Sequence, residues 1–185
     1  FAEILKHSLI HDKNFFRWLK KNTKKIIEDL DFATLKYAII KSCKIKLYFV
    51  SKDEREKSIR MKLNFGHTFA HGIEAACNFS RKINHGEAVL VGMNLATKLS
   101  FKKKSCSFET LSEIDKFYSD NNLPSNLGKY FSKKSFPKII QYMIGDKKNV
   151  DDKINFILIK RIGKTSKPGN YKIKVRDMNN IINRL

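Results

Sequence analysis

Three histidines in the middle of the chain have the spacing of a metal site. His67 and His71 stand four residues apart, so they lie on one face of a helix, one turn from each other. His85 opens the next apolar segment. Neutral imidazole is a common ligand of zinc and related cations, and a catalytic metal usually takes three protein ligands. The pattern therefore suggests a metal centre, although spacing alone does not identify an acidic ligand.

The first two histidines also have a simpler interpretation. A His-x-x-x-His pair is common among histidines that are only structural. Zinc proteases carry Glu directly after the first histidine, and Thr68 at that position excludes this hydrolase chemistry. His85 favours the metal interpretation because it stands beside a glycine at an expected helix start, where backbone can approach a ligand. A short link over 77–84 would let the two helices pack antiparallel and return His85 toward His67.

Most of the chain has the pattern of amphipathic helices. Asp31, Asn84 and Ser107 are suited to cap the helices that follow them. A further helix is expected at about 137–144, with Gly145 near its end. Apolar residues recur at helical spacing in three segments: residues 15–19, 35–43 and 89–96.

The C-terminal tail has a different pattern. Residues 154–159 and 171–175 have strand character, and glycines between them supply turns, which predicts a small β-hairpin. Asp177 is suited to cap a last short helix that ends at Leu185. The expected fold class is therefore mainly α, with one helical domain and a minor β element near the C-terminus.

The formal net charge of +20 raises the alternative of a nucleic-acid-binding helical module. The basic residues occur in short runs spread along the chain, which is the usual pattern of a solvated surface. Lysine is also in excess over arginine, which favours a solubilising surface over bidentate phosphate recognition. No RNA-binding aromatic signature, paired-cysteine finger or basic zipper is present. We therefore expect no nucleic-acid partner.

Cysteine usage and hydropathy indicate a reducing, aqueous compartment. Cys43, Cys77 and Cys106 are widely spaced and include no Cys-x-x-Cys pair. No run approaches the roughly 18 apolar residues of a membrane span, and no signal-peptide pattern occurs at the N-terminus. We expect a cytoplasmic protein with no membrane association. Phe1 already reads as helix interior, so we interpret the chain as a fragment that lacks an N-terminal part.

A long ordered motif gives the chain a family resemblance. It runs from Arg60 to Glu74 as RMKLNFGHTFAHGIE and resumes at His85 as HGEAV, with Gly-Met at 92–93. This motif resembles the signature of the 3-dehydroquinate synthases, which more often have Gly at position 70 and Ala at position 72. Outlying segments also fit that family: Ala2-Glu3-x-x-Lys6, Lys46, residues 53–56, residues 146–148 and Gly163.

The resemblance implies one half of a two-domain enzyme. Residues 1–185 would form the helical metal- and substrate-binding domain, and the N-terminal α/β domain that binds most of the NAD would be absent from this chain. The implied reaction converts the seven-carbon sugar acid phosphate DAHP to 3-dehydroquinate and phosphate. This is a lyase step of the shikimate pathway of aromatic amino acid biosynthesis. A homodimer is expected at full length, and we expect the fragment alone to be inactive.

The same resemblance implies roles for individual residues. Zinc or cobalt would be held by Glu3, His67 and His85, which supplies the carboxylate that spacing left open. Glu74 and Glu87 are expected to be structural or to support the ligands. The substrate carries a carboxylate and a phosphate, so its pocket needs charged and polar donors. By resemblance, that pocket contains the catalytic residues His71, Lys6 and Glu56 and the substrate-binding residues Lys46, Arg60, Asn64 and Lys147.

Other interpretations stay open at this point. Another sugar-phosphate cyclase would share much of the motif and differ mainly in its pocket contacts. A polyol dehydrogenase of the iron-dependent alcohol dehydrogenase group has a similar helical metal domain, but its ligands usually include Asp. Lys46 has many apolar neighbours in sequence, so its aliphatic stem could simply cover apolar surface. Lys147 could equally belong to a solvated turn.

Overall fold

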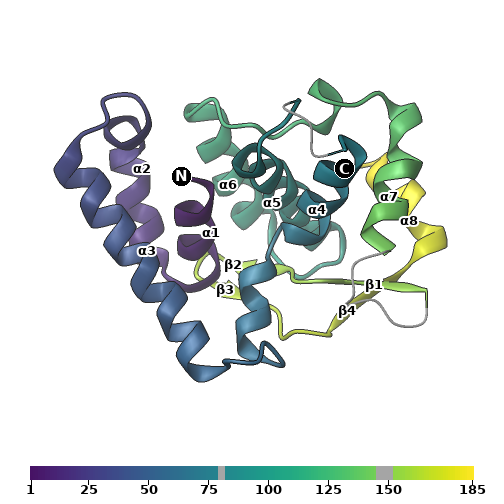
Figure 1. The fold of residues 1–185 in the computed structure, drawn as a ribbon, viewed down its shortest axis with the longest axis horizontal. Helices are drawn as coiled ribbons and strands as arrows, with labels where there is room; N and C mark the ends of the chain where they lie inside the picture. Colours follow the sequence, from purple (N-terminus) through teal and green to yellow (C-terminus); the bar gives the residue numbers. More distant parts are fainter. Residues whose placement is uncertain (79–81, 145–151) are drawn as a thin grey trace.

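Helices make up most of the fold, which confirms the predicted class (Figure 1). The computed structural model describes residues 1–78, 82–144 and 152–185. Its α-helices are α1 (Ala2–His11), α2 (Lys13–Ile27), α3 (Phe32–Lys52), α4 (His67–Ala76), α5 (His85–Lys102), α6 (Phe108–Asp120), α7 (Phe136–Ile144) and α8 (Val175–Ile182). Three 3-10 helices, η1 (Ile59–Asn64), η2 (Leu127–Lys129) and η3 (Lys133–Ser135), and four strands, β1 (Lys153–Phe156), β2 (Ile159–Arg161), β3 (Lys164–Thr165) and β4 (Tyr171–Lys174), complete the described part.

The first helix is almost entirely buried. It lies between the α2–α3 pair and α5, and it contacts all three helices (Figure 1). Leu5 and Leu9 are fully buried along it. Asp12 caps α2 by accepting the backbone N–H of Phe15 at 2.9 Å, so the chain turns sharply after α1. Packing on several sides gives α1 a fixed orientation, and the polar residues it carries share that orientation.

Helices α4 and α5 pack antiparallel, as the sequence predicted. Contacts run in opposite order along them, because Gly66 meets Met93 whereas Glu74 meets His85. The two backbones approach so closely that a Cβ atom on Gly92 would lie 2.3 Å from the carbonyl oxygen of Gly66. Only glycine fits at such a crossing without displacement. This contact therefore fixes the distance between the start of α4 and the middle of α5.

Helix α4 also packs closely against α7. A Cβ atom on Gly72 would lie 2.9 Å from the carbonyl oxygen of Ile139, whereas Ala70 is fully buried toward the core. The departure from the family pattern at positions 70 and 72 therefore coincides with a tight helix crossing. Asn84 caps α5 as predicted, and Glu87 completes a reciprocal capping box with it.

The two tail segments predicted to form a hairpin do pair antiparallel, and a second strand pair lies between them in the sequence. Strand β1 pairs with β4, with Ile154 opposite Ile173, and β2 pairs with β3 between them. The predicted strand at 154–159 is thus divided between β1 and β2. At the inner turn, Gly163 has φ +83° and donates its N–H to the carbonyl oxygen of Leu9 at 2.8 Å. The tail is therefore attached directly to the end of α1.

Two predictions about helix ends have different outcomes. Asp31 and Ser107 do cap α3 and α6. Asp177 was predicted to cap the last helix, and this is wrong, since the helix begins at Val175 directly after β4. The Asp177 carboxylate lies in the first turn instead, where the helix dipole still favours it, and the helix ends at Ile182 rather than Leu185. Gly145 lies outside the described residues.

None of the helices in the described ranges is long and apolar enough to cross a membrane.

Candidate metal centre

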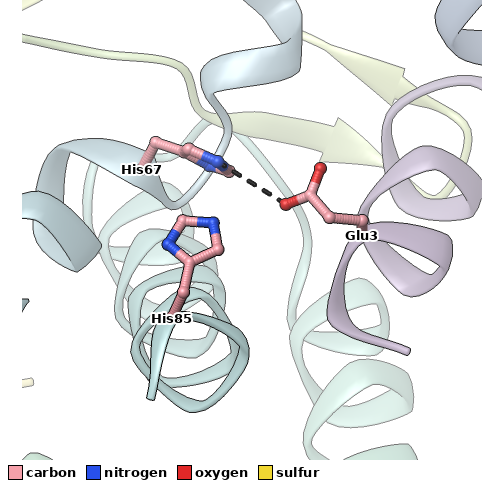
Figure 2. A group of neighbouring side chains, drawn as sticks. All are labelled: Glu3, His67 and His85. Atoms are coloured by element: carbon pink, nitrogen blue, oxygen red, sulfur yellow. Dashed lines mark ion pairs between the residues drawn. The ribbon is translucent and has the colours of Figure 1, made fainter. Parts of the chain in front are cut away.

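Glu3, His67 and His85 converge on one point, although they are far apart in the sequence (Figure 2). One potential ligand atom from each lies within 4.8 Å of those of the other two. His67 Nε2 is 3.5 Å from Glu3 Oε1, and the ring centroids of His67 and His85 are 5.8 Å apart. The structure therefore brings together the three residues that the resemblance implied as ligands.

Each of these residues stands at the beginning of a helix. Glu3 is in the first turn of α1. His67 is the first residue of α4, directly after Gly66, whose φ of +81° lets the chain enter the helix abruptly. His85 is the first residue of α5, fixed by the capping box around Asn84. The group is thus mounted on three helices that pack together through the core.

The surroundings keep Glu3 and His67 in the forms that bind a cation. Burial, with the nearby Lys6 ammonium, lowers the pKa of His67 to about 4, so its imidazole is neutral at neutral pH. Burial alone would raise the pKa of Glu3, but the charge and hydrogen bond of Lys6 outweigh it and hold that pKa below its usual value. A neutral imidazole and an ionised carboxylate are the metal-binding forms.

An orphaned oxygen supports the fit of a cation. Glu3 Oε1 is buried and has no hydrogen-bond partner within the described ranges, whereas its Oε2 accepts from Lys6 at 2.6 Å. Leaving a buried acceptor unsatisfied costs roughly 1–3 kcal/mol, more if it is charged. Two imidazole nitrogens and one carboxylate oxygen form a common catalytic zinc set, with bonds of about 2.0–2.2 Å. The side chains would draw together slightly around such an ion.

One side of the centre is open. The side chain of His85 is 55% exposed, whereas that of His67 is only 13% exposed. Catalytic metal sites keep a position free for water or substrate, in contrast with closed structural sites. The arrangement therefore has the character of a reactive centre with access from one face.

The substrate pocket was predicted to contain Lys6, Lys46 and His71. Lys6 is only 3% exposed and donates to Glu3, and its burial lowers its pKa despite that carboxylate. Lys46 on α3 is exposed, and its charge also contributes to lowering the pKa of Lys6. His71 is exposed on α4, with its ring centroid 5.6 Å from that of His67. Lys6 and His71 therefore border the centre, and the roles of Lys6, Lys46 and His71 stay predictions.

Three further predicted residues form a cluster between α3 and α4. Asn64 Nδ2 donates to Glu56 Oε1 at 2.6 Å, and Arg60 Nη1 donates to the carbonyl oxygen of Glu54 at 2.6 Å. The loop itself is organised by Asp53, whose carboxylate accepts backbone N–H groups, among them that of Arg60 at 3.0 Å. Burial alone would raise the pKa of Asp53, but these hydrogen bonds outweigh it and hold that pKa below its usual value. The predicted roles of Glu56, Arg60 and Asn64 toward the substrate stay predictions.

Lys147 lies outside the described residues, so its predicted role in substrate binding also stays a prediction.

Comparison with known proteins supplies the family. The family described as "3-dehydroquinate synthase C-terminal" matches residues 1–149. The chain belongs to the 3-dehydroquinate synthase family. A 3-dehydroquinate synthase of Pelagibacter ubique is 48% identical over 163 residues, which cover 88% of this chain and 44% of the relative. One of Dictyoglomus thermophilum is 40% identical over 168 residues, with the same two coverages.

The chain spans less than half the length of the curated 3-dehydroquinate synthases it matches. Solved structures share its fold over their corresponding half. The 2-epi-5-epi-valiolone synthase of Streptomyces hygroscopicus, with NAD+ and Zn2+ bound, has a TM-score of 0.80 at 20% identity. The match covers 99% of this chain and 49% of that synthase. A 2-deoxy-scyllo-inosose synthase with carbaglucose-6-phosphate, NAD+ and Co2+ has a TM-score of 0.78 at 21% identity. That match covers 99% of this chain and 50% of the synthase.

Two further residues of this synthase-family chain lie near the centre. Glu74, expected only to be structural or supporting, has an oxygen 3.0 Å from His85 Nδ1. His7 is buried beside Lys6, and its Nδ1 lies 2.6 Å from Ser42 Oγ. A signal for Glu74 existed, since it stands seven residues after His67 on the same helix face. No motif indicated His7.

Proposed function

We propose that this chain is the metal- and substrate-binding half of a 3-dehydroquinate synthase, which converts DAHP to 3-dehydroquinate and phosphate. The observation that carries the proposal is the convergence of Glu3, His67 and His85 beside the buried ammonium of Lys6. Family membership supports the reaction, because the named relatives are 3-dehydroquinate synthases. A carbon–oxygen lyase of this kind would act in the shikimate pathway.

Glu3, His67 and His85 would hold zinc or cobalt. When bound there, the metal would supply a Lewis acid that acidifies a substrate hydroxyl. Zn2+ and Co2+ in the two solved relatives support this choice of ion. The open side next to His85 would admit the substrate, and the buried side next to Lys6 would exclude water from the reacting groups.

The surrounding residues would bind the anionic parts of the substrate. Lys6 and Lys46 offer point charges for a phosphate or carboxylate, and Arg60 offers a planar fork that suits a carboxylate. The exposed imidazole of His71 would give or take a proton beside the centre. Glu56, Asn64 and Lys147 would complete the pocket. The role of these residues is to orient the substrate and to stabilise charge as it develops.

The redox part of the reaction would need a second domain. Both solved relatives contain NAD+, and this chain corresponds to about half of each. We therefore propose that a separate N-terminal domain binds most of the NAD, and that the complete enzyme is a homodimer. Residues 1–185 alone would bind metal but would not position a hydride acceptor. The isolated chain should accordingly be inactive.

The proposal is tested in two steps. In the first, the isolated chain is loaded with zinc, dialysed and analysed for metal. We expect about one ion per chain, in keeping with a single three-ligand site. In the second, the chain is fused behind the part of the Pelagibacter ubique relative that it does not cover, which the proposal expects to bind NAD, and phosphate release from DAHP is measured with NAD and zinc. Fused protein that binds zinc but leaves DAHP unchanged would contradict the substrate assignment.

Another cyclase activity is the main alternative. The two solved relatives are cyclases for other products, but they are only 20–21% identical to this chain, so they show the fold alone. The 3-dehydroquinate synthases are 40–48% identical. The same fused protein should therefore release phosphate faster from DAHP than from glucose 6-phosphate. A reversed preference would favour the alternative.

A further inference from the structure

A carboxylate contacts His85 on the side of its Nδ1 atom. Glu74 Oε1 lies 3.0 Å from that nitrogen. Glu74 stands on α4 seven residues after His67, and residues at this spacing share a helix face. Helix α4 therefore carries one predicted ligand, His67, and two turns later a group that contacts another predicted ligand on α5.

This contact determines which nitrogen of His85 is left for an ion. A carboxylate oxygen accepts a hydrogen bond, so in the neutral imidazole this contact favours the tautomer with the proton on Nδ1 and the lone pair on Nε2. His67 has a matching arrangement, because its Nδ1 lies 3.4 Å from the carbonyl oxygen of Phe65 and its Nε2 faces Glu3. Both imidazoles are thus held through Nδ1, and both leave Nε2 available.

His85 needs this support more than His67 does. Its side chain is 55% exposed, against 13% for His67, whereas the side chain of Glu74 is only 15% exposed. An exposed imidazole has several rotamers, and restricting it to one costs conformational entropy when an ion binds. A largely buried carboxylate that already holds Nδ1 reduces this cost before binding.

We propose that Glu74 is a positioning residue that sets the tautomer and orientation of His85 for metal binding. The inference rests on the proposed metal centre and extends it to a residue beyond the three ligands. Partners of this kind typically change metal affinity by roughly 10–100-fold. Glu87 differs, because its carboxylate accepts the backbone N–H of Asn84 at 3.0 Å in the capping box. Of the two glutamates, Glu74 is the one that acts on the metal centre.

The first test is the zinc affinity of the 185-residue chain, measured by competition with a chromophoric chelator. Glu74→Ala should weaken binding roughly 10–100-fold. Glu74→Gln should weaken it less, because the amide oxygen can still accept from Nδ1. The matched control is Glu113→Ala on α6, which removes another ion-paired glutamate, 3.1 Å from Lys20, and should leave the affinity unchanged. Thermal unfolding of the metal-free variants verifies that each is folded.

The second test separates positioning from a general structural role. In the metal-free chain, nitrogen-15 chemical shifts of His85 should indicate the tautomer with its proton on Nδ1. Glu74→Ala should shift the ring toward the other tautomer, and Glu74→Gln should largely restore the first. Wild-type zinc affinity or an unchanged tautomer in Glu74→Ala would overturn the inference. A wild-type chain that binds no zinc would instead reject the proposed function, and this inference with it.

Discussion

The metal centre and the cluster around Arg60 achieve their geometry by different means. Glu3, His67 and His85 each lie in the first turn of a helix, and those helices pack through the core. The cluster lies on η1 and on the connection from α3 to it, where the Asp53 carboxylate accepts three backbone N–H groups within eight residues of chain. The centre therefore depends on tertiary packing, whereas the cluster depends mainly on local hydrogen bonds.

This difference suggests a division of labour. A metal needs ligand atoms held within a few tenths of an ångström, which rigid helices provide. An anionic substrate can be bound by long side chains on a loop that adjusts as it binds. We therefore expect changes in the helix core to alter metal affinity, and changes in the loop to alter substrate binding while metal affinity persists.

The largest expected effect comes from removing a ligand on α4. His67→Ala should lower zinc affinity by more than 100-fold, since losing a ligand should exceed the 10–100-fold effect of losing a supporting partner. The matched control is His71→Ala, which removes an imidazole one turn away that is outside the convergent group. Zinc content after dialysis measures both. Equal loss in the two variants would show that His71 is also a ligand and would break the assignment.

The next effect tests whether packing positions the ligands. Gly92→Ala would place a Cβ atom 2.3 Å from the carbonyl oxygen of Gly66, directly before His67. Overpacking of this kind costs about 3 kcal/mol in the free energy of unfolding, measured in urea. The same substitution at Gly86, where the nearest atom is 3.4 Å away, should be almost neutral. Similar destabilisation by both substitutions would contradict the role of the α4–α5 contact.

Burial on α1 should make stability depend on pH. Burial, with the charge of Lys6, lowers the pKa of His7 to about 4 in the folded chain, against about 6.5 when unfolded. Between these values the unfolded chain binds a proton that the folded chain excludes, so stability falls as the pH drops from about 6.5 toward 4. The contribution of His7 is up to about 3 kcal/mol at the acid end.

His7→Gln isolates this contribution. Glutamine can still reach Ser42 but does not titrate, so the variant should lose less stability than wild type between pH 6.5 and 4.5. Urea unfolding of both metal-free proteins at each pH measures the difference. An equal loss of unfolding free energy in the two proteins would show that His7 is not the group responsible. It would also contradict the close burial of α1 beside the centre.

Helix caps and the pairing of neighbouring elements were predictable from sequence, whereas the exact element boundaries in the tail were not. The caps Asp31, Asn84 and Ser107 were predicted correctly because a cap acts within three residues. The antiparallel pairing of β1 with β4 was also predicted, as a hairpin, whereas the inner pairing of β2 with β3 was not. The predicted cap at Asp177 was wrong because α8 begins at Val175, directly where β4 ends, and the sequence pattern did not indicate that boundary.

The candidate site was predictable only in part. The spacing of His67 and His71 indicated a metal but could not tell which of them faces it. Glu3 came from the family resemblance, because 64 residues separate it from His67 and no local rule connects them. Glu74 was visible as a residue on the ligand-bearing face of α4, but its partner His85 was undefined until α5 packed against it.

The smallest effect on zinc affinity is expected from a substitution in the loop, and it tests directly whether the loop and the helices are independent. Asp53→Ala removes the carboxylate that accepts the N–H groups of Lys57 and Ser58 at 3.0 and 2.7 Å. Hydrogen exchange of the Lys57, Ser58 and Arg60 amides should become faster, because those groups lose their acceptor. Zinc affinity should stay within about twofold of wild type, since the ligands are mounted on helices. Glu54→Gln, which alters a neighbouring exposed carboxylate, should change neither quantity. If Asp53→Ala weakened zinc binding as strongly as Glu74→Ala, the loop and the helices would form one cooperative unit, and the proposed division between metal and substrate elements would fail.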